Sequence, residues 1–355
     1  MKTKKNQGKQ KITFWKKVKF ILVISFVSLI VFLFAAEILL SIINPQPYQY
    51  PTLKFSEKYK KVYHSNIIIK DYNPPETRYY STNELGFRKS SCTLSLSKEN
   101  EKPNIVLLGD SFTFGIGVND GFEFASVMAD KLQQHYNVIN LGIGGWGLTQ
   151  EIRVFYDEGQ SFNPEFAIII FCNNDPNDNL LDAVTEIKNG KFEFIDSNEA
   201  SGGILSKVSK LLSRSIIQKS NLYNSIRNFL YLKYHANAIE QINDSEVKIS
   251  EIPKNEKFYC DLLDVFAHDL NQKGVKLLFA SINNLNDGVI ESELNDFPFI
   301  KNHIFELDSL GLIDYVNIDE WFNKDDMTPS PVGHYDKRWN FVLGDNLADY
   351  VLSNK

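Results

Sequence analysis

The sequence of 355 residues predicts an α/β fold, a three-layer α/β/α sandwich around a parallel sheet, preceded by one transmembrane helix. Two observations lead to this prediction. From residue 104 onward, apolar runs typical of buried strands alternate with segments of helical spacing. Near the N-terminus, one apolar run is as long as a membrane-spanning helix. Strands separated by helices imply right-handed crossovers, and these make the sheet parallel.

The apolar run covers residues 20–43 and contains one charged residue, Glu37, near its outer end. About 20 residues suffice for a helix to cross a bilayer. Residues 1–19 hold eight lysines and no acid, so the positive-inside rule predicts a cytoplasmic basic tail and an extracytoplasmic body. A cleaved signal peptide is the alternative. Because such a peptide has a shorter apolar core and a small-residue cleavage site, we favour an uncleaved anchor.

Charge and cysteine content exclude several classes of protein. Removing the eight N-terminal lysines from the net charge of −6 leaves about −14 for the rest of the chain. An acidic body argues against nucleic-acid binding, which needs a basic face. The three cysteines are too few for a disulfide framework, and no Cys-x-x-Cys or Cys/His cluster indicates structural zinc. We therefore expect neither a metal nor an organic cofactor.

The chain divides into four predicted parts. The basic tail (1–19) and the transmembrane helix (20–43) are followed by a juxtamembrane extended segment over residues 44–101, which begins with several prolines. Residues 102–355 form the predicted main domain, with a helical insertion at about 185–255. The insertion begins with a predicted hairpin, continues through a flexible joint at 201–203, and contains a long amphipathic stretch at 204–235. We interpret this stretch as a helical cap packed on the core; a surface that touches the membrane or covers the active site is the alternative.

Within the domain, strands and helices alternate. Strands are predicted at 104–109, 136–142, 165–174, 275–282 and 314–318, and helices at 122–136, 148–159, 258–274 and 338–352. Ligands of parallel sheets bind at the carboxyl ends of the strands. Ser111, Gly145 and Asn174 each lie at or just past the end of a predicted strand. We therefore expect these three residues to lie at one edge of the sheet.

These residues suit acyl transfer. A serine hydroxyl is a weak nucleophile that needs a general base, and Ser111 would begin a helix whose N–H groups stabilise negative charge. Gly144 and Gly145 leave a bare backbone that can approach a ligand, and Asn174 can offer its amide. Several N–H donors around one oxygen are what an acyl-transfer transition state requires. Nearby, Trp146 is interpreted either as a sugar-stacking residue or as a wedge in the glycine loop.

The expected base is a histidine. His135, His235 and His268 lie on predicted helices, His64 precedes the domain, and His303 lies in a segment of unassigned structure. His334 lies in the loop before the last predicted helix, so it can return to the edge of the sheet. His334 is therefore the candidate base.

Four segments, in order, resemble the SGNH (GDSL-type) hydrolase superfamily: "GDSFTFG", "NLGIGGWGLTQE", "FCNNDPNDN" and "GHYDKRWN". The upstream "NELGFRKS" resembles a segment found in membrane-anchored members, so the similarity covers roughly residues 80–355. The resemblance implies a flavodoxin-like sheet and a nucleophilic Ser111 with His334 as base. It also implies an oxyanion hole made by Ser111, Gly145 and Asn174.

One position departs from the family pattern. The family places its acid two or three residues before the histidine, where this chain has Val332 and Pro331. Asp325 and Asp326 are the candidate acids, and Asp336 follows the histidine closely. A Ser–His dyad helped by a backbone carbonyl is also open. The acid matters because it orients the imidazole and stabilises the imidazolium.

The predicted function is a serine esterase or O-acyltransferase that passes through an acyl-Ser111 intermediate. Its expected substrates are acyl esters of a cell-envelope or exported glycan, and its other predicted partner is the membrane. The alternatives are a lipase- or phospholipase-like esterase and a catalytically decayed glycan-binding protein of the same fold. The acyl group, the acceptor, the choice between hydrolysis and transfer, and the oligomeric state are left open by the sequence.

Overall fold

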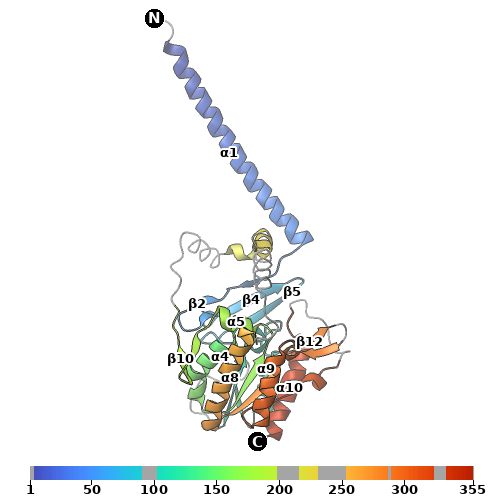
Figure 1. Cartoon of the computed structure of the whole chain (residues 1–355). Coiled ribbons are helices and arrows are strands. Elements are labelled where there is room, and N and C mark those ends of the chain that lie inside the picture. The colour runs from blue at the N-terminus through green and yellow to red at the C-terminus, as the bar shows by residue number, and fades with distance from the viewer. Residues whose placement is uncertain are drawn as a thin grey trace. The chain divides into compact units, whose positions relative to one another are not determined.

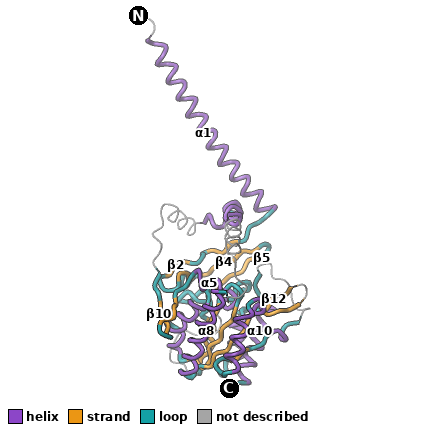
Figure 2. Tube along the Cα trace, in the orientation of Figure 1, coloured by secondary structure: helices purple, strands orange, loops and turns teal. Residues whose placement is uncertain are grey.

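The structure is a computed structural model that describes residues 4–89, 102–197, 216–230, 253–286, 289–323 and 333–354. The chain forms two compact units (Figures 1 and 2). One combines Met1–Tyr48 with Lys210–Ser245, and the other combines Gln49–Ser209 with Glu246–Lys355. The second unit contains the parallel sheet.

The central sheet has five parallel strands in the order β14-β11-β8-β6-β7 (Figure 1). They are β6 (Asn104–Gly109), β7 (Asn137–Asn140), β8 (Pro164–Phe171), β11 (Lys276–Ser281) and β14 (Asp314–Tyr315). The predicted parallel sheet is therefore confirmed, with the order of a flavodoxin-like fold. Strand β8 is apolar on both faces because it lies in the middle of the sheet, with helices on either side.

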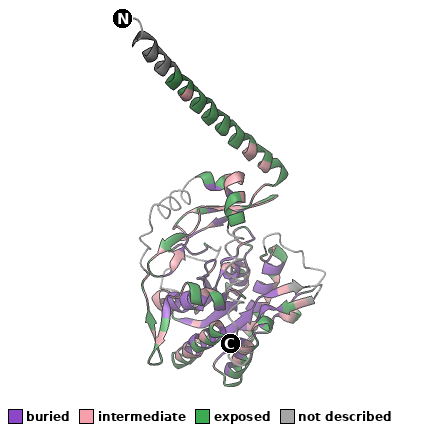
Figure 3. Ribbon diagram, turned by 45° about the horizontal axis from the view of Figure 1, so that its top comes forward, coloured by how far each residue is buried: buried purple, intermediate pink, exposed green. Residues whose placement is uncertain are grey.

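Helices cover both faces of this sheet, which confirms the three layers. On β8, Ile168 and Ile170 belong to one core cluster, and Ala167 and Ile169 belong to the other, because alternate side chains of a strand point to opposite faces. The first cluster includes α3 (Phe124–Leu132) and α10 (Lys337–Ser353), and the second includes α4 (Leu148–Asp157), α8 (Lys254–Gln272) and α9 (Pro298–Ser309). Figure 3 shows the buried residues along the sheet between these two layers. Neither core cluster includes a described residue of the first unit.

The segment before β6 is a folded part of this unit. It contains β1 (Tyr48–Tyr50), β4 (Ile68–Asn73) and β5 (Glu76–Ser81) in one sheet, and β2 (Lys54–Ser56) paired with β3 (Lys60–Val62). The sequence predicts an extended juxtamembrane segment over residues 44–101. In the structure Tyr63, Tyr80 and Phe87 are buried in the larger core cluster. Full burial of one large apolar side chain contributes about 1.5–3 kcal/mol of stability. The three aromatic residues therefore stabilise the packing of this segment on the body.

Further short elements complete the unit. The predicted hairpin is confirmed as β9 (Thr185–Lys188) paired with β10 (Lys191–Phe194). A second hairpin, β12 (Asn283–Asn286) with β13 (Val289–Ser292), and helix α9 were not assigned from the sequence. The short helices are α2 (Ser111–Phe114), α5 (Asp175–Leu181), η1 (Gly159–Phe162), η3 (Glu293–Asp296) and η4 (Asp319–Trp321). The expected flexible joint at 201–203 lies outside the described residues.

The first unit contains the long helix α1 (Lys4–Ile43), drawn in blue in Figure 1. Its segment Phe14–Ile43 is long and apolar enough to cross a membrane, which agrees with the expected apolar helix. The same unit includes η2 (Ile216–Lys219) and a helix over residues 221–230. These belong to the amphipathic stretch expected at 204–235, and the other residues of that stretch lie outside the described part of the chain.

Candidate active site

Ser111 lies where β6 ends and a short helix begins. Gly109 closes the strand with a φ of +152°, and a Cβ there would lie 2.2 Å from the hydroxyl oxygen of Thr113, so the close approach requires glycine. Asp110 is the N-cap of α2, and its Oδ1 accepts a hydrogen bond from the Phe112 N–H at 2.9 Å. Ser111 is thereby placed at the start of the helix, and its side chain lies at the carboxyl edge of the sheet.

The His334 ring contacts the Ser111 hydroxyl. Its Nε2 lies 2.8 Å from Ser111 Oγ, although the two residues are 223 positions apart in the chain. Asp110 Oδ2 lies 3.1 Å from the same Oγ. A hydroxyl has one hydrogen, so it donates to either the ring or the carboxylate at a given moment. The imidazole is therefore in position to take the serine proton.

Helix α10 positions the loop that holds His334. Asp336 is its N-cap and accepts hydrogen bonds from the N–H groups of Arg338 and Trp339, both at 2.9 Å. Such a cap stabilises a helix by about 1 kcal/mol. The ring of His334 also packs on Phe112, with centroids 4.7 Å apart. Asp336, considered above as an acid partner, thus serves as the cap of this helix.

The glycine loop runs beside Ser111. A Cβ added to Gly144 would lie 3.6 Å from Ser111 Cβ, and Gly145 has a φ of +73°, which favours glycine. Lys61 lies next to this turn, with its Nζ 3.1 Å from the position of a Gly145 Cβ and 2.9 Å from Asp182. The backbone of the glycine turn is therefore close to the serine, with one cation at its rim.

Trp146 is a wedge rather than a sugar platform. Its ring is buried and packs on Tyr59 and Phe87, with centroids 5.3 and 6.2 Å away. Its Nε1–H donates to the Lys61 carbonyl at 2.8 Å. The ring is therefore inaccessible to a ligand and fixes the glycine loop against the N-terminal strands.

Asn174 follows the strand next to that of Ser111. Gly109 at the end of β6 is in register with Ile170 of β8, so residues after these two strands leave the sheet at the same edge. The Asn174 amide donates to Asp178 at 2.8 Å. An amide has two N–H donors, so it can also serve the oxygen of a ligand.

Two carboxyl groups are fully buried behind these loops. Burial raises the pKa of Glu151 well above its usual range, and the nearby charge of Asp110 raises it further. The pKa of Asp175 is raised well above its usual range by burial and then by the charges of Glu151 and Asp110. Within the described part of the chain, both oxygens of Glu151 and Oδ1 of Asp175 lack a hydrogen-bond partner. Burial therefore disfavours the charged form of both acids, and no sequence pattern pointed to Glu151.

The N-terminal strands bring another carboxylate near the histidine. Asp71 on β4 accepts a hydrogen bond from the Tyr80 hydroxyl at 2.5 Å, and that hydroxyl accepts from the Gly117 N–H at 3.0 Å. Gly117 packs against the histidine, since its Cβ position is 3.4 Å from His334 Cβ. Burial raises the pKa of Asp71, and the Tyr80 hydrogen bond and the charges of Arg78 and His334 oppose that rise. Asp71 and His334 thus interact electrostatically, which no local pattern indicated.

The upstream "NELGFRKS" segment contributes a brace for the loop after Ser111. Its Arg88 is completely buried, with a guanidinium 4.4 Å from the centre of the Tyr80 ring. It donates to the carbonyls of Gly115 and Val118 at 3.0 and 2.9 Å and forms an ion pair with Asp120 at 2.8 Å. The segment therefore stabilises the backbone that follows the serine.

Asp325 and Asp326 lie outside the described residues, as do Pro331 and Val332. Among the residues that the structure describes, no cluster of three or more histidine, cysteine or carboxylate side chains is suited to a metal ion.

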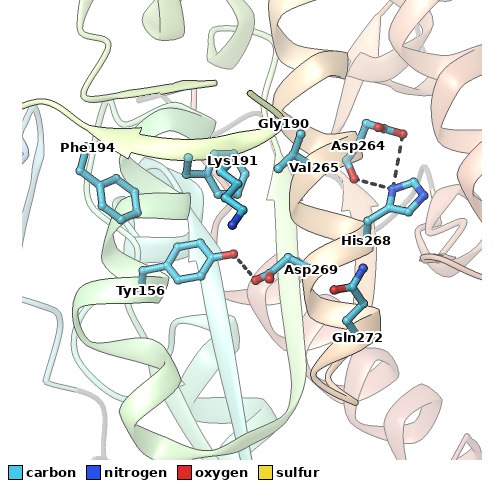
Figure 4. Close-up of a pocket in the computed structure, with 10 residues that line it drawn as sticks. Tyr156, Gly190, Lys191, Phe194, Asp264, Val265, His268, Asp269 and Gln272 are labelled. Carbon is cyan, nitrogen blue, oxygen red and sulfur yellow. Dashed lines mark hydrogen bonds and ion pairs between the residues drawn. The ribbon is translucent and has the colours of Figure 1, made fainter. Parts of the chain in front are cut away.

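A hollow is lined by Tyr156, the β9–β10 hairpin and His268 (Figure 4). Since α4 and α8 end beside it, this hollow lies at the opposite, amino edge of the sheet. It does not include any of the predicted site residues.

The chain is similar in sequence to one known protein family. The family model described as GDSL-like Lipase/Acylhydrolase matches residues 105–334. A comparison with curated proteins gives no significant match.

Solved structures include similar chains at low identity. The esterase EstA from Pseudoalteromonas sp. is 11% identical, with 71% of this chain and 98% of that chain covered and a TM-score of 0.39. Est24, a carbohydrate acetylesterase from Sinorhizobium meliloti, is 12% identical, with 72% and 100% covered and a TM-score of 0.39. An aryl esterase from M. smegmatis is 12% identical, with 71% and 99% covered and a TM-score of 0.40.

The family match begins on β6, just before the Gly-Asp-Ser turn, and ends at His334, so it spans all the segments on which the resemblance rests. The chain belongs to the GDSL-like lipase/acylhydrolase family, a family of esterases and acylhydrolases.

Proposed function

We propose that this member of the family is a working serine esterase, with Ser111 as nucleophile and His334 as general base. The observation that carries the proposal is the 2.8 Å contact between His334 Nε2 and Ser111 Oγ at the start of a helix. A base within hydrogen-bond distance of a hydroxyl is the first geometric requirement for an activated serine.

In the proposed reaction, Ser111 Oγ attacks the ester carbonyl while its proton passes to His334 Nε2. Negative charge then develops on the carbonyl oxygen, where the N–H groups of Ser111 and Gly145 and the Asn174 amide would donate to it. His334 returns the proton to the departing alcohol, which leaves an acyl-Ser111 ester. In the second half, His334 deprotonates a water that attacks this ester. The bond between the acyl group and Ser111 Oγ then breaks, His334 returns the proton to Oγ, and the carboxylic acid product leaves. A sugar hydroxyl in place of that water would give acyl transfer.

The acid that orients His334 is proposed to be Asp326 or Asp325, which precede it in the sequence. Asp71 offers a different route, through its electrostatic interaction with His334. Single Asp→Asn variants at the three positions separate these routes. Substitution of the true partner should lower kcat/KM strongly and shift the acidic limb of the pH profile of kcat/KM. The reason is that the imidazolium loses the charge that stabilises it. Variants at the other positions should leave the pH profile unchanged.

The proposed substrates are short acyl esters on a cell-envelope or exported glycan. Two features support this choice: a catalytic unit attached to a helix that can span a membrane, and the acidic character of the chain outside its basic tail. Under this proposal α1 anchors the protein, with the lysine-rich N-terminus in the cytoplasm and the catalytic unit outside. Acetylated polysaccharides and phospholipids, supplied to the full chain in detergent, would distinguish a glycan esterase from a lipase.

A fluorophosphonate probe tests the central claim without knowledge of the substrate. We expect the full chain to be labelled at Ser111, and Ser111→Ala and His334→Ala to lose the label. His268→Ala is the matched control, because His268 lies on an exposed part of α8 at the other edge of the sheet. Absence of labelling in the folded wild type would contradict the proposal and favour a decayed site that only binds its ligand.

A further inference from the structure

Glu37 has an unusual position for a carboxylate. It is the only acid in the apolar run at 20–43, where ionisable side chains are costly unless they have partners. In the structure its two oxygens accept four hydrogen bonds: from Ser220 Oγ at 2.6 Å, the Asn221 N–H at 2.7 Å, the Leu222 N–H at 2.9 Å and Asn221 Nδ2 at 3.1 Å. All of these donors lie at the beginning of the helix over residues 221–230.

This arrangement is a helix cap supplied by a different helix. The first N–H groups of a helix have no partner within the helix, and they form the positive end of its dipole. Ser220 caps the Tyr223 N–H at 3.1 Å, and Glu37 accepts the two N–H groups that precede it. The carboxylate therefore attaches the start of helix 221–230 to the outer end of α1.

The polar side of helix 221–230 forms hydrogen bonds with other residues of the first unit. Asn221 Oδ1 accepts from the Gln46 N–H at 2.8 Å, and Asn228 donates to the Gln46 side chain at 3.4 Å. Asn224 is buried and donates to the Gln218 carbonyl at 2.6 Å. The three asparagines are spaced for one helical face, so this face is used for contacts within the first unit.

The apolar side of the same helix faces outward. Ile226, Phe229 and Leu230 follow the spacing of one helical face and are 53%, 66% and 58% exposed, and Ile217 just before the helix is 45% exposed. A helix on a water-soluble body has the opposite arrangement, with its apolar face buried, as in α10. We call these four residues the outward apolar patch. A cluster of exposed large apolar side chains indicates a partner surface.

We infer that helix 221–230 lies in the surface of the bilayer that α1 crosses, with the outward apolar patch inserted among the lipid chains. The inference rests on the proposed anchoring by α1, and it commits to lipid as the partner because the patch is attached to a membrane-spanning helix. Glu37 precedes the end of α1 at Ile43 by six residues, or about 9 Å along the helix. An interfacial helix buries its apolar face about 5–10 Å deep. The distance from Glu37 to the end of α1 matches this depth. Exposed Lys219 and Arg227 can meet anionic headgroups.

Spin labels on the full chain in vesicles test the inference. The vesicles contain phosphatidylcholine and phosphatidylglycerol in equal parts. Cys92 is replaced by serine, and Cys172 and Cys260 are kept because both are buried. Single cysteines are then introduced as Phe229→Cys in the patch, Phe26→Cys on α1, and Phe341→Cys on the exposed side of α10. Collisions with oxygen report lipid, and collisions with a water-soluble nickel chelate report water.

We expect the ratio of oxygen to nickel collisions at position 229 to exceed that at position 341 several-fold and to approach that at position 26. A lipid-like value at 26 with a water-like value at 229 would overturn the inference while leaving the anchor intact. Water-like values at both 26 and 229 would overturn the anchor and the inference together. Fluorophosphonate labelling of Ser111 in the same samples tests catalysis separately.

Substitution at Glu37 tests the cap. Glu37→Gln keeps the size of the side chain but replaces one acceptor oxygen with a donor group, so it cannot accept all four hydrogen bonds. We expect it to lower the ratio at 229 several-fold toward the value at 341, with no change at 26. An unchanged ratio at 229 would overturn the role given to Glu37.

Discussion

The two ends of the parallel sheet contain similar residues in different arrangements. At the carboxyl end, a histidine contacts a serine hydroxyl beside a glycine turn. At the amino end, the hollow in Figure 4 also has a histidine, carboxylates and a tyrosine. There, His268 Nδ1 lies 2.8 Å from the Asp264 carbonyl of its own helix, and Asp269 is occupied by the Tyr156 hydroxyl and Lys273. The histidine at this end is therefore held by its own helix.

The direction of the helices explains the difference. Helices α2, α4 and α5 begin at the carboxyl end, so the positive ends of their dipoles lie at that end. Helices α4 and α8 end at the amino end, where carbonyl groups favour cations such as Lys273. Residue types alone therefore do not make an esterase site; the polarity of the surrounding backbone matters as well.

The largest effect is expected from Ser111→Ala. Loss of the nucleophile should reduce kcat/KM on an aryl acetate by about 10⁴-fold or more, because a triad works as a unit. The control is Ser161→Ala. Ser161 lies just before β8, at the amino end, and its hydroxyl donates to the Glu158 carbonyl. Equal losses in both variants would mean that the two ends do not differ in chemistry.

Asn174→Ala should have the next largest effect. Removal of one oxyanion donor lowers kcat by about 10²–10³-fold in enzymes of this type, with a smaller change in KM. Asn177→Ala on the same short helix is the control, since its side chain is exposed and contacts Asn255. A change confined to KM would assign Asn174 to substrate binding and remove it from the oxyanion hole.

Glu151→Gln should change how stability depends on pH. The pKa of Glu151 is raised well above 4.5 in the folded protein, so the folded state keeps a proton that the unfolded chain releases. Stability is therefore present below the unfolded pKa and is lost as pH rises toward the folded pKa. In urea unfolding of the full chain in detergent, we expect the free energy of unfolding to fall less steeply for the variant than for the wild type as the pH rises from about 5 to about 8.

This result depends on comparison of two slopes, so a constant cost of the substitution cancels. Identical slopes for Glu151→Gln and the wild type would contradict a raised pKa at this position. Asp175→Asn provides a second test, because burial and then the charge of Glu151 raise the pKa of Asp175.

The smallest effect is expected from His268→Ala. His268 is half exposed and is held by its own helix, so its removal should leave kcat/KM unchanged and alter the free energy of unfolding by no more than about 0.5 kcal/mol. Activity on the aryl ester and urea unfolding measure both quantities. A large loss of activity would give the amino end a catalytic role and remove the contrast between the two ends.

Much of the second unit could be predicted because its elements have clear periodicity. Strand β8 is a continuous apolar run, and the helices have apolar residues at helical spacing. Residues 49–89 were not predicted as folded, since their strands are short and mixed in polarity and gain stability only by packing on the body. Trp146 shows the same limit, because its burial depends on Tyr59 and Phe87 from that segment.

By itself, the sequence determined the apolar helix, the parallel sheet and the family, and it identified Ser111, Gly145, Asn174 and His334 as candidates. These follow from patterns within single elements and from the rule that ligands bind where parallel strands end. Only the tertiary structure decided which distant residues meet: His334 with Ser111, Asp71 near His334, and Glu37 with helix 221–230. Contacts between elements depend on how whole helices and strands pack, and no local spacing of residues encodes that packing.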